Sequence, residues 1–460
     1  MYSKSLFLLL GVVPSLSICT PPPRRHQPAN SVPLTVKTTP EGNFFDAKVT
    51  LGDFIFELQV DTGSSDLWVA RKGFQCYDRT NKTQLAPPEV CRYEAVPKYD
   101  PSASPTFSKL ENETFGVTYG AGIALGVVGT EEVRLGDITV RGQTIGVADR
   151  ITVPGDDLSS GILGLGYPLL TSAHPGMTVA NDTISLLTNK VLYEPLLFRM
   201  HNQGLIPGWY SLTLARLPRG QSAGSGGFLG LGALPGVETK GPFATTPVEL
   251  TEALPVELTG GKISEWTLSV EGVVWSPGNS SISPRTNTTT FQAVVDSGNY
   301  FNQLPQEIAD PVNAAFTPPA TYDAVTDSYI VGCDAVPPSL GFTIAGSTFS
   351  QSPGDMIFQF PNGTCISTIK RSGTGEGLTL NFLGAAWLQN VIAVFDFGRN
   401  EMRFAQRADS DAVFNGSTAS TRNSTSPPFM ISSAVQLKSS QRFGSSILLL
   451  LAWGISVLIL

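Results

Sequence analysis

The sequence predicts a mainly β protein built from two related lobes. Short apolar runs recur along the chain, several of them alternating with polar residues, and 46 glycines and 34 prolines favour turns between them. No long amphipathic helical pattern interrupts these runs. A short acidic motif also occurs twice, once in each half of the chain. Such a repeat indicates β lobes related by a pseudo-twofold axis, with a cleft between them.

The composition argues against several classes of protein. The 460 residues carry 38 acidic and 30 basic side chains, whereas a nucleic-acid-binding protein needs a basic surface to neutralise phosphates. Hydrophobic residues make up 41% of the chain, which is too many for a disordered protein. Three histidines and five cysteines argue against a His/Cys metal cluster, so we expect no metal and no other cofactor.

The N-terminal residues have the pattern of a secretory signal peptide over 1–19. Lys4 precedes an apolar stretch at 6–13, and small residues follow it. The alternative is a buried strand, since the stretch is too short to span a bilayer comfortably. Residues 20–40 contain six prolines and the pair Arg24-Arg25. We expect them to form a short leader that is not part of a domain.

A β-hairpin is predicted where the folded part begins. Apolar residues alternate over 43–51 and 54–60, on either side of Gly52-Asp53. Short helices are expected only near 184–192 and 305–315. Further strands are predicted at 115–119, 124–128, 131–140, 208–214, 268–275, 291–295, 355–360 and 391–405.

The repeated motif is an apolar strand that runs into Asp-(Thr/Ser)-Gly. Residues 59–65 (Gln-Val-Asp-Thr-Gly-Ser-Ser) correspond to residues 294–300 (Val-Val-Asp-Ser-Gly-Asn-Tyr). Each copy is followed by two apolar residues and a glycine, at 162–164 and at 382–384. The spacing from the aspartate to that glycine is 103 residues in the first copy and 88 in the second, so the first lobe has the longer loops.

The repeat divides the folded part into an N-terminal lobe over 41–215 and a C-terminal lobe over 216–408. A glycine-rich link at 220–236 follows the crossover. In this link, Gly-Gln-Ser222-Ala-Gly matches the nucleophile elbow of serine hydrolases, which needs a helix after the serine and a histidine later in the chain. All three histidines precede Ser222, and the glycine-rich surroundings disfavour a helix, so we interpret the segment as a turn.

Two Asp-(Thr/Ser)-Gly turns that meet across a pseudo-twofold axis bring Asp61 and Asp296 together. Two carboxylates at close range cannot both ionise cheaply, so they share one proton. The charged carboxyl can act as a general base on a water held between them, and the protonated one can polarise a peptide carbonyl and protonate the leaving amine. The alternative is two unrelated Asx turns. Residues expected to support the pair are Thr62, Gly63, Ser64, Ser297, Gly298 and Asn299.

The motifs together resemble those of pepsin-like aspartic proteases over about residues 42–408. The run Asp61-Thr-Gly-Ser-Ser-Asp-Leu-Trp-Val is similar to the first active-site motif of that family, and Val-Asp296-Ser-Gly is similar to the second. Residues 117–122 (Val-Thr-Tyr-Gly-Ala-Gly) resemble the flap hairpin that closes over substrate. The resemblance implies that Tyr119 caps the cleft and bonds to the Trp68 indole. The flap and cleft residues are therefore expected to be Trp68, Tyr119, Gly120 and Ala121.

Two departures from the family pattern concern the second motif and the leader. Asn299 stands where the family usually has a hydroxyl residue that bonds the outer oxygen of the aspartate, and we expect the Asn299 amide to donate that bond. Tyr300 is expected to narrow a neighbouring subsite. Family zymogens usually carry a longer, basic, partly helical prosegment, so the short leader implies weak inhibition or none.

The cysteines fit a secreted protein. Cys19 is expected to leave with the signal peptide. Four cysteines allow three connectivities, and proximity favours Cys76 with Cys91 and Cys333 with Cys365. Family disulfides are commonly found at these places as well. Disulfides are the expected state in an oxidising compartment.

The C-terminus has the pattern of a GPI-attachment signal. A Ser/Thr-rich stalk over 409–433 is followed by a polar spacer and an apolar end, and we expect 434–460 to be removed and the lipid to be attached at Ser432. The alternative is a tail-anchored transmembrane helix, for which the apolar end is short. Asn-x-Ser/Thr sequons, expected to be glycosylated, occur at Asn81, Asn112, Asn181, Asn279, Asn287, Asn362, Asn415 and Asn423.

A pepsin-like enzyme with a GPI tail resembles the fungal yapsin group in particular. These observations predict a monomeric aspartic endopeptidase that passes through the secretory pathway to the cell surface, at the plasma membrane or cell wall. Its expected partners are a protein or peptide substrate and, through a lipid anchor, the membrane. The rival hypothesis is a non-catalytic binding protein that uses the same fold.

Overall fold

The computed structural model describes residues 31–411 except 40–41, 79–83, 94, 121, 153–154, 179–187, 218–220, 235, 279–282 and 376–377. The expected signal peptide, most of the stalk and the GPI signal with Ser432 lie outside the described residues. So do five of the sequon asparagines, namely Asn81, Asn181, Asn279, Asn415 and Asn423. No helix within the described residues is long and apolar enough to cross a membrane.

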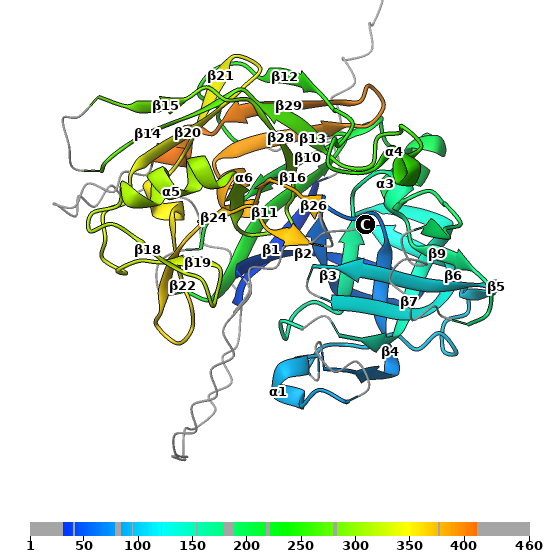
Figure 1. The fold of residues 1–460 in the computed structure, drawn as a ribbon. Coiled ribbons are helices and arrows are strands. Elements are labelled where there is room, and N and C mark those ends of the chain that lie inside the picture. The colour runs from blue at the N-terminus through cyan, green and yellow to red at the C-terminus, as the bar shows by residue number, and fades with distance from the viewer. Residues whose placement is uncertain are drawn as a thin grey trace, which may run out of the picture.

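The protein is mainly β, as predicted, and one large sheet runs through both halves of the chain (Figure 1). The predicted first hairpin is present as two strands of this sheet, β2 and β3. In sheet order the strands are β12 (Ala244–Pro247), β29 (Glu401–Gln406), β28 (Val391–Asp396), β10 (Trp209–Leu214), β11 (Ala223–Leu231), β1 (Ser31–Thr39), β2 (Gly42–Leu51), β3 (Phe54–Asp61), β8 (Gly161–Gly164), β4 (Leu67–Cys76), β7 (Ile138–Ile151), β6 (Gly122–Leu135), β5 (Ser108–Tyr119) and β9 (Ala173–Pro175).

Smaller sheets complete the C-terminal half. A five-stranded sheet contains β13 (Thr267–Val270), β16 (Phe291–Val295), β27 (Phe382–Leu383), β17 (Asn302–Leu304) and β24 (Ile369–Arg371). Two four-stranded sheets contain β15 (Arg285–Asn287), β14 (Gly272–Ser276), β20 (Ser339–Ile344) and β21 (Ser347–Gln351), and β18 (Thr321–Asp323), β19 (Ser328–Ile330), β23 (Cys365–Ser367) and β22 (Ile357–Gln359). A two-stranded ribbon contains β25 (Thr374–Gly375) and β26 (Leu378–Thr379).

The helices within the described residues are short, as the sequence predicts. The helix expected near 305–315 is present as α5 (Gln306–Ala314). Of the one expected near 184–192, residues 184–187 lie outside the described residues and residues 189–192 are not helical. The other α-helices are α1 (Pro88–Cys91), α3 (Leu196–Asn202), α4 (Val256–Thr259) and α6 (Ala385–Leu388). Single 3-10 turns are η1 (Pro168–Leu170), η2 (Pro353–Asp355) and η3 (Ala408–Asp411).

The predicted leader is wrong in its second half. Residues 31–39 form β1, which pairs with β2 on one side and with β11 on the other. Val32, Leu34 and Val36 alternate with more exposed residues and are buried, so this segment contributes to the core. The prolines between residues 20 and 40 misled the interpretation, although Pro33 is accommodated inside the strand.

The glycine-rich link is also a strand rather than a turn. Residues 223–231 form β11, and the predicted lobe boundary at 215/216 falls between β10 and β11, which pair with each other. Because β10 also pairs with β28, the sheet crosses the boundary without a break. Ser222 is followed by a strand, which rules out the helix that a nucleophile elbow needs.

Three of the long predicted strands are each two strands. Residues 131–140 contain a turn at Gly136, which has a left-handed φ of 59° and separates β6 from β7. Residues 268–275 divide into β13 and β14, which belong to different sheets. Residues 391–405 form the hairpin of β28 and β29. Apolar runs alone do not mark such divisions.

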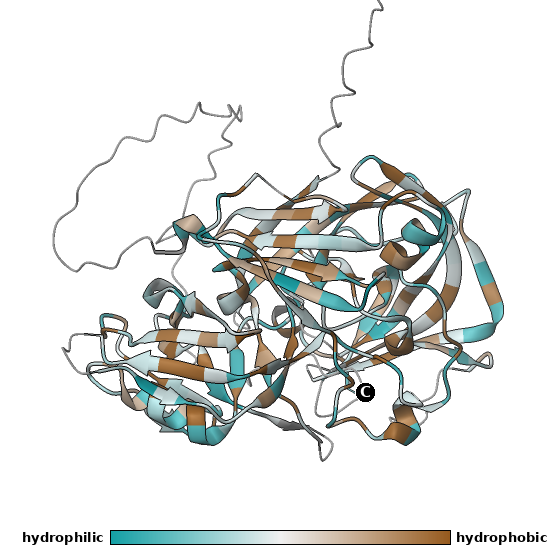
Figure 2. Ribbon diagram, turned by 90° about the horizontal axis from the view of Figure 1, so that it is seen from above, coloured by the Kyte–Doolittle hydropathy of each residue, from teal (hydrophilic) through white to brown (hydrophobic). Residues whose placement is uncertain are grey.

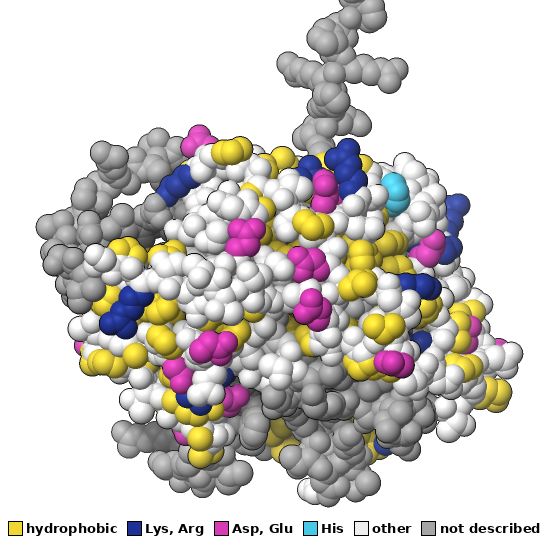
Figure 3. All heavy atoms as spheres, turned by 45° about the horizontal axis from the view of Figure 1, so that its top comes forward, with side chains coloured by type: hydrophobic (Ala, Val, Ile, Leu, Met, Phe, Trp, Pro, Cys, Tyr) yellow, Lys and Arg dark blue, Asp and Glu magenta, His cyan; other side chains and the backbone are white. Residues whose placement is uncertain are grey.

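Buried side chains form one main core across both halves of the chain. Hydrophobic and hydrophilic residues alternate along many strands (Figure 2), as expected for strands with one face toward a core. At its centre the ring of Phe395 stacks on Tyr210 at 4.9 Å and meets Trp266 edge-on at 5.1 Å. On the described part of the surface in Figure 3, acidic and basic side chains lie dispersed among uncharged ones.

Both predicted disulfides are present. The Cys76–Cys91 bond connects the end of β4 to α1, and the Cys333–Cys365 bond connects a loop to β23. Each closes a loop of modest length, which in the chain-entropy description stabilises the fold by roughly 3 kcal/mol.

A network of polar side chains connects the segment after β10 to the C-terminal half of the chain. Arg216 lies just after β10 and donates through Nε to both carboxylate oxygens of Asp355, at 2.7 and 2.8 Å. Asn390 donates to the same carboxylate at 2.9 Å. Because Asp355 is only 5% exposed, its loss leaves the guanidinium without its counter-charge.

We expect Asp355→Ala to lower the free energy of unfolding by about 3 kcal/mol. Urea unfolding followed by tryptophan fluorescence measures the change. Asp137→Ala, at an exposed turn between β6 and β7, is the matched control and should change stability by less than about 0.5 kcal/mol. Equal losses in both variants would contradict a role for the network.

Candidate active site

Each repeated aspartate lies at the end of a strand that pairs in parallel with the later part of its own repeat. In the first half β3 pairs with β8, so that Asp61 lies opposite Gly164. In the second half β16 pairs with β27, and Val295 lies opposite Leu383. Asp296 follows Val295 directly, so the two halves use the same local construction. This accounts for the apolar-apolar-Gly segments that the sequence repeats.

The two motif glycines show how closely the aspartates approach. A Cβ atom on Gly63 would lie 2.7 Å from Cγ of Asp296, and one on Gly298 would lie 2.4 Å from Oδ1 of Asp61. Each glycine therefore lies against the carboxyl group of the opposite motif, at a distance that no side chain permits. The structure thus brings Asp61 and Asp296 to the same point between the halves, and both are fully buried.

Hydrogen bonds connect each of the two Asp-(Thr/Ser)-Gly turns to the other. Thr62 Oγ1 donates to the carbonyl of Val295 at 2.7 Å and accepts from the Ser297 amide at 2.9 Å. Ser297 Oγ donates to the carbonyl of Val60 at 2.8 Å and accepts from the Thr62 amide at 3.1 Å. This pattern is the same in both directions. It fixes the distance between the two carboxyl groups through four bonds between buried groups.

The two carboxyl groups differ in their outer contacts. Asp61 accepts a bond from the Gly63 amide at 2.9 Å and another, through Oδ2, from the Ser64 hydroxyl. Asp296 accepts from the Gly298 amide at 2.8 Å and more weakly from the Asn299 amide N–H at 3.3 Å. Its bonds all reach Oδ1, while Oδ2 is buried and has no partner among the described residues.

The bond expected from the Asn299 side chain is absent. Asn299 Oδ1 instead accepts from the Phe301 backbone N–H at 3.1 Å, and Nδ2 is buried without a partner among the described residues. The bond from Phe301 fixes the orientation of the side-chain amide, and in this orientation Nδ2 makes no bond to the Asp296 carboxyl group. Tyr300, expected beside a subsite, lies in the main core, where its ring packs 5.3 Å from Phe358.

Burial raises the pKa of both aspartates above its ordinary value. The pKa of Asp61 is held down by the bonds from Ser64 and Gly63. The pKa of Asp296 is raised further by the negative charge of Asp61. The charge of Asp61 thus acts against ionisation of Asp296, while the bonds from Ser64 and Gly63 favour ionisation of Asp61.

The flap hairpin is present as β5 and β6. Tyr119 ends β5 and pairs with Gly122 at the start of β6, so the hairpin reverses direction between these two residues. The Trp68 indole donates to the Tyr119 hydroxyl at 2.8 Å, as the resemblance implies, and both side chains are nearly fully buried. Ala121 lies outside the described residues.

Two polar residues at this site were not identified from the sequence as site residues. Gln59 lies on β3 and donates to the Gly298 carbonyl at 3.2 Å, which adds a further bond between the motifs. Glu265 lies two residues before the start of β13 and is only 3% exposed. Burial, together with the charge of Asp61, raises the pKa of Glu265 from 4.5 to about 8. The sequence offers one signal for such residues, which is a polar side chain next to or within an apolar strand. This signal does not identify the groups that lie opposite that side chain in the folded protein.

The raised pKa of Glu265 predicts a pH-dependent stability. The unfolded chain releases this proton near pH 4.5, whereas the folded chain keeps it up to about pH 8. Between these values the folded state binds more protons, so the free energy of unfolding falls as pH rises through this window. The free energy of unfolding of Glu265→Gln should therefore rise relative to that of the wild type between pH 4.5 and 8, by on the order of a few kcal/mol.

Urea unfolding at pH 4.5, 6 and 8 measures this difference. Glu238→Gln, at an exposed position, is the matched control and should show no such trend. A stability difference between Glu265→Gln and wild type that does not change with pH would contradict the assignment.

Comparison with known proteins agrees with the geometry of this site. A profile of the eukaryotic aspartyl protease family matches residues 46–407. The chain therefore belongs to the eukaryotic aspartyl protease family and is an aspartic endopeptidase.

Its relatives include fungal enzymes that align over most of their length. A probable aspartic-type endopeptidase of Aspergillus fumigatus is 39% identical over 375 residues, which cover 80% of each chain. Rhizopuspepsin of Rhizopus chinensis is 27% identical over 381 residues, 81% of each chain. The crystal structure of the aspartic proteinase from Irpex lacteus aligns with a TM-score of 0.59 and 22% identity, over 84% of this chain and 99% of that one. The last comparison shows that the fold is shared.

Proposed function

We propose that this protein hydrolyses peptide bonds through a shared-proton dyad formed by Asp61 and Asp296. The observation that carries the proposal is the pair of buried carboxyl groups held against the opposite motif glycines by crosswise bonds from Thr62 and Ser297. Such an arrangement keeps both carboxyl groups rigid without a metal ligand or a nucleophilic side chain.

The reaction then proceeds by proton transfers without a covalent enzyme intermediate. Asp61 accepts a proton from a water molecule as its oxygen attacks the peptide carbonyl carbon, and Asp296 donates its proton to the carbonyl oxygen. The tetrahedral intermediate carries two hydroxyl groups. Proton transfer from Asp61 to the amide nitrogen allows the C–N bond to break, and one hydroxyl returns its proton to Asp296 as the new carboxylic acid forms. The enzyme ends in its starting protonation state.

The unequal surroundings of the two carboxyl groups support this division of roles. Asp61 Oδ2 is engaged by the Ser64 hydroxyl, which favours its charged form. Asp296 Oδ2 has no donor among the described residues, so it is suited to carry a proton. A further bond from the Asn299 side-chain amide would have lowered the pKa of Asp296, and the absence of that bond helps to separate the two roles.

We also propose that the enzyme acts at the cell surface as a GPI-anchored, glycosylated protein of the yapsin type. Support comes from the signal-like N-terminus, the apolar C-terminal end and the two disulfides. Among the sequon residues that the structure describes, Asn112 and Asn362 are exposed and Asn287 is half-buried. Its substrate would be an extended peptide segment bound under the flap.

Cleavage of a denatured protein from pH 3 to 7, with and without a peptide inhibitor that carries a hydroxyl in place of the scissile carbonyl, tests the dyad. We expect cleavage that the inhibitor blocks. Tight inhibitor binding without cleavage at any pH would instead support the non-catalytic hypothesis. Release of the protein from membranes by a phosphatidylinositol-specific phospholipase tests the anchor, and retention of accessible protein would count against it.

A further inference from the structure

Glu265 lies near Asp61, whose charge acts on it, and two residues before the start of β13 in the five-stranded sheet. Thr267 pairs with Val294 in this sheet, and the Val295 amide donates to the Trp266 carbonyl at 2.9 Å, so the ladder continues toward residue 265. Two residues on, Glu265 therefore lies across from Asp296. The Trp266 side chain packs in the main core against Phe395. Since neighbouring side chains on a strand point to opposite faces, Glu265 points away from the core and toward the face that carries Asp296.

This carboxyl group has no partner of its own. Glu265 makes no hydrogen bond or ion pair with any described residue, and its Oε2 atom is buried. A buried carboxyl group without a partner is costly to the fold, because its lost hydration is not replaced. An unsatisfied buried group calls for an explanation, and the position of Glu265 across from Asp296 suggests a partner on a molecule bound at the dyad.

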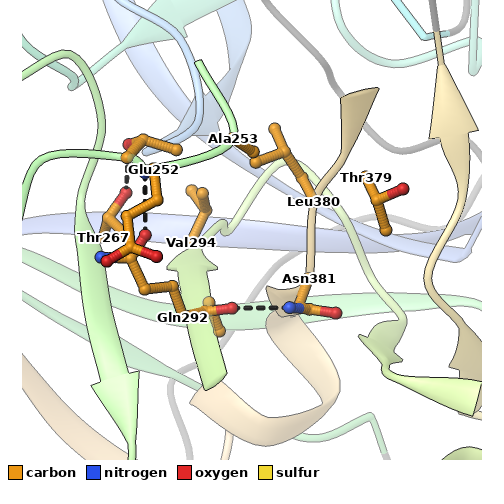
Figure 4. A pocket seen from close by; sticks show the side chains of 10 residues that line it. Glu252, Ala253, Thr267, Gln292, Val294, Thr379, Leu380 and Asn381 are labelled. Atoms are coloured by element: carbon orange, nitrogen blue, oxygen red, sulfur yellow. Dashed lines mark hydrogen bonds between the residues drawn. The ribbon is translucent and has the colours of Figure 1, made fainter. Parts of the chain in front are cut away.

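A polar pocket is lined by the next cross-strand pair of the five-stranded sheet, Thr267 and Val294 (Figure 4). Its volume is about 170 Å³, and a cavity of roughly 150 Å³ is large enough to hold benzene. Two residues along a strand span about 7 Å, so the pocket begins at Thr267 and Val294, next to Glu265 and Asp296. Its other lining residues, which include no lysine or arginine, are Thr251, Glu252, Ala253, Gln292, Ala293, Thr379, Leu380 and Asn381.

We propose that Glu265 is a specificity-determining residue, which binds an N–H-donating side chain of the substrate at the subsite beside Asp296. This inference rests on the proposed function, because it assumes that a peptide lies over the dyad. Side chains of this chemistry are the carboxamides of Asn and Gln and the cations of Lys and Arg. An aliphatic side chain at the same subsite would leave Glu265 without a partner.

The charges around Glu265 govern which form of the group meets the substrate. The titratable groups that face it are Asp61 and Asp296 on the dyad turns, with Glu252 at the pocket. All are acidic, so in the empty cleft Glu265 holds its proton. A neutral acid pairs with a carboxamide through two hydrogen bonds, one in each direction. A cation instead displaces that proton to solvent and forms an ion pair with the carboxylate.

A matched peptide set tests the proposal. The peptides differ at one position only, which carries Leu, Gln or Lys in turn, and the position is moved through three residues on each side of the cleaved bond. At one position we expect kcat/KM for the Gln or the Lys peptide to exceed that for the Leu peptide by about tenfold or more. Preference for Gln identifies the neutral acid, and preference for Lys identifies the carboxylate.

Variants at residue 265 separate recognition from folding. Glu265→Leu should abolish the preference, so that this variant cleaves the Gln and Lys peptides no faster than the Leu peptide. Glu265→Gln should retain a preference for the Gln peptide and lose one for Lys, because its amide oxygen still accepts an N–H but carries no charge. Glu238→Leu, an exposed position, should leave all ratios unchanged.

Dissociation constants of hydroxyl-bearing inhibitor peptides with Leu, Gln or Lys at the same positions provide a readout that does not need catalysis. Cleavage of all three peptides within twofold at every position would overturn the inference and leave the proposed function intact. So would a preference that survives in Glu265→Leu. Absence of any cleavage would overturn the proposed function, and the inhibitor constants would then decide whether Glu265 still selects N–H donors.

Discussion

Asp296→Asn should reduce kcat by roughly 10²–10⁴-fold, the range that positioned acid–base groups contribute. The asparagine amide has the same shape as the protonated carboxyl group but cannot give up a proton to the peptide carbonyl and recover it. Because Asp296 is neutral when it holds the shared proton, the substitution places no new charge in the buried site. We therefore expect the free energy of unfolding to stay within about 1 kcal/mol of wild type.

Initial rates on a fluorogenic peptide, together with urea unfolding, measure both effects. The matched control is Asp53→Asn, at the exposed turn of the first hairpin, which should leave kcat unchanged. Retention of more than about a tenth of wild-type activity by purified Asp296→Asn would contradict the dyad.

Gly298→Ala should also inactivate the enzyme, although it changes no polar group. The added methyl carbon would lie 2.4 Å from Asp61 Oδ1 and 2.7 Å from its Cγ atom. Both atoms belong to a residue held by Gly63 and Ser64, so the clash is relieved only if the two turns move apart. We expect kcat to fall by about 10²-fold, because small misplacements of catalytic groups have effects of that size. We also expect the free energy of unfolding to fall by roughly 1–3 kcal/mol, because the added methyl group overpacks the site.

Gly236→Ala is the control for this prediction. A Cβ atom there meets no other atom within 4 Å, and the backbone is not left-handed. This variant should match wild type in kcat and in urea unfolding. If Gly298→Ala were as active as Gly236→Ala, the two carboxyl groups could not be as close as the structure has them.

The sequence predicts the two aspartate motifs better than the segments around them. Asp61 and Asp296 were identified because each ends an apolar strand and begins a turn, a pattern that survives in both halves of the chain. The partners of Thr62 and Ser297 follow from the same repeat. Pairing within one repeat is a local property, and local properties are readable from the order of residues.

Contacts across the sheet are not readable in this way. Glu265 is a single glutamate before an apolar strand, and its place beside the dyad follows only from the pairing of β13 with β16 and the bond between Val295 and Trp266. The side chain of Asn299 was expected to donate to Asp296, but its oxygen is bound by a backbone N–H two residues away, and its Nδ2 atom does not bond the carboxyl group. Residues 31–39 were assigned to a leader because proline counts outweighed the alternation of Val32, Leu34 and Val36, while their partner strand β11 lies about 190 residues away.

The position of β1 has a consequence for the order in which the protein can fold during its synthesis. Ser31 pairs with Gly230, so the N-terminal strand cannot be enclosed until about half of the chain has left the ribosome. The neighbouring pair of β10 and β28 waits for residues 393–396. Pairings of such long sequence separation form slowly. Asp61 also needs Asp296 for its partner, and the strand that ends before Asp296 pairs with β27 at residues 382–383, so peptide-bond cleavage should begin only after this later segment has been made.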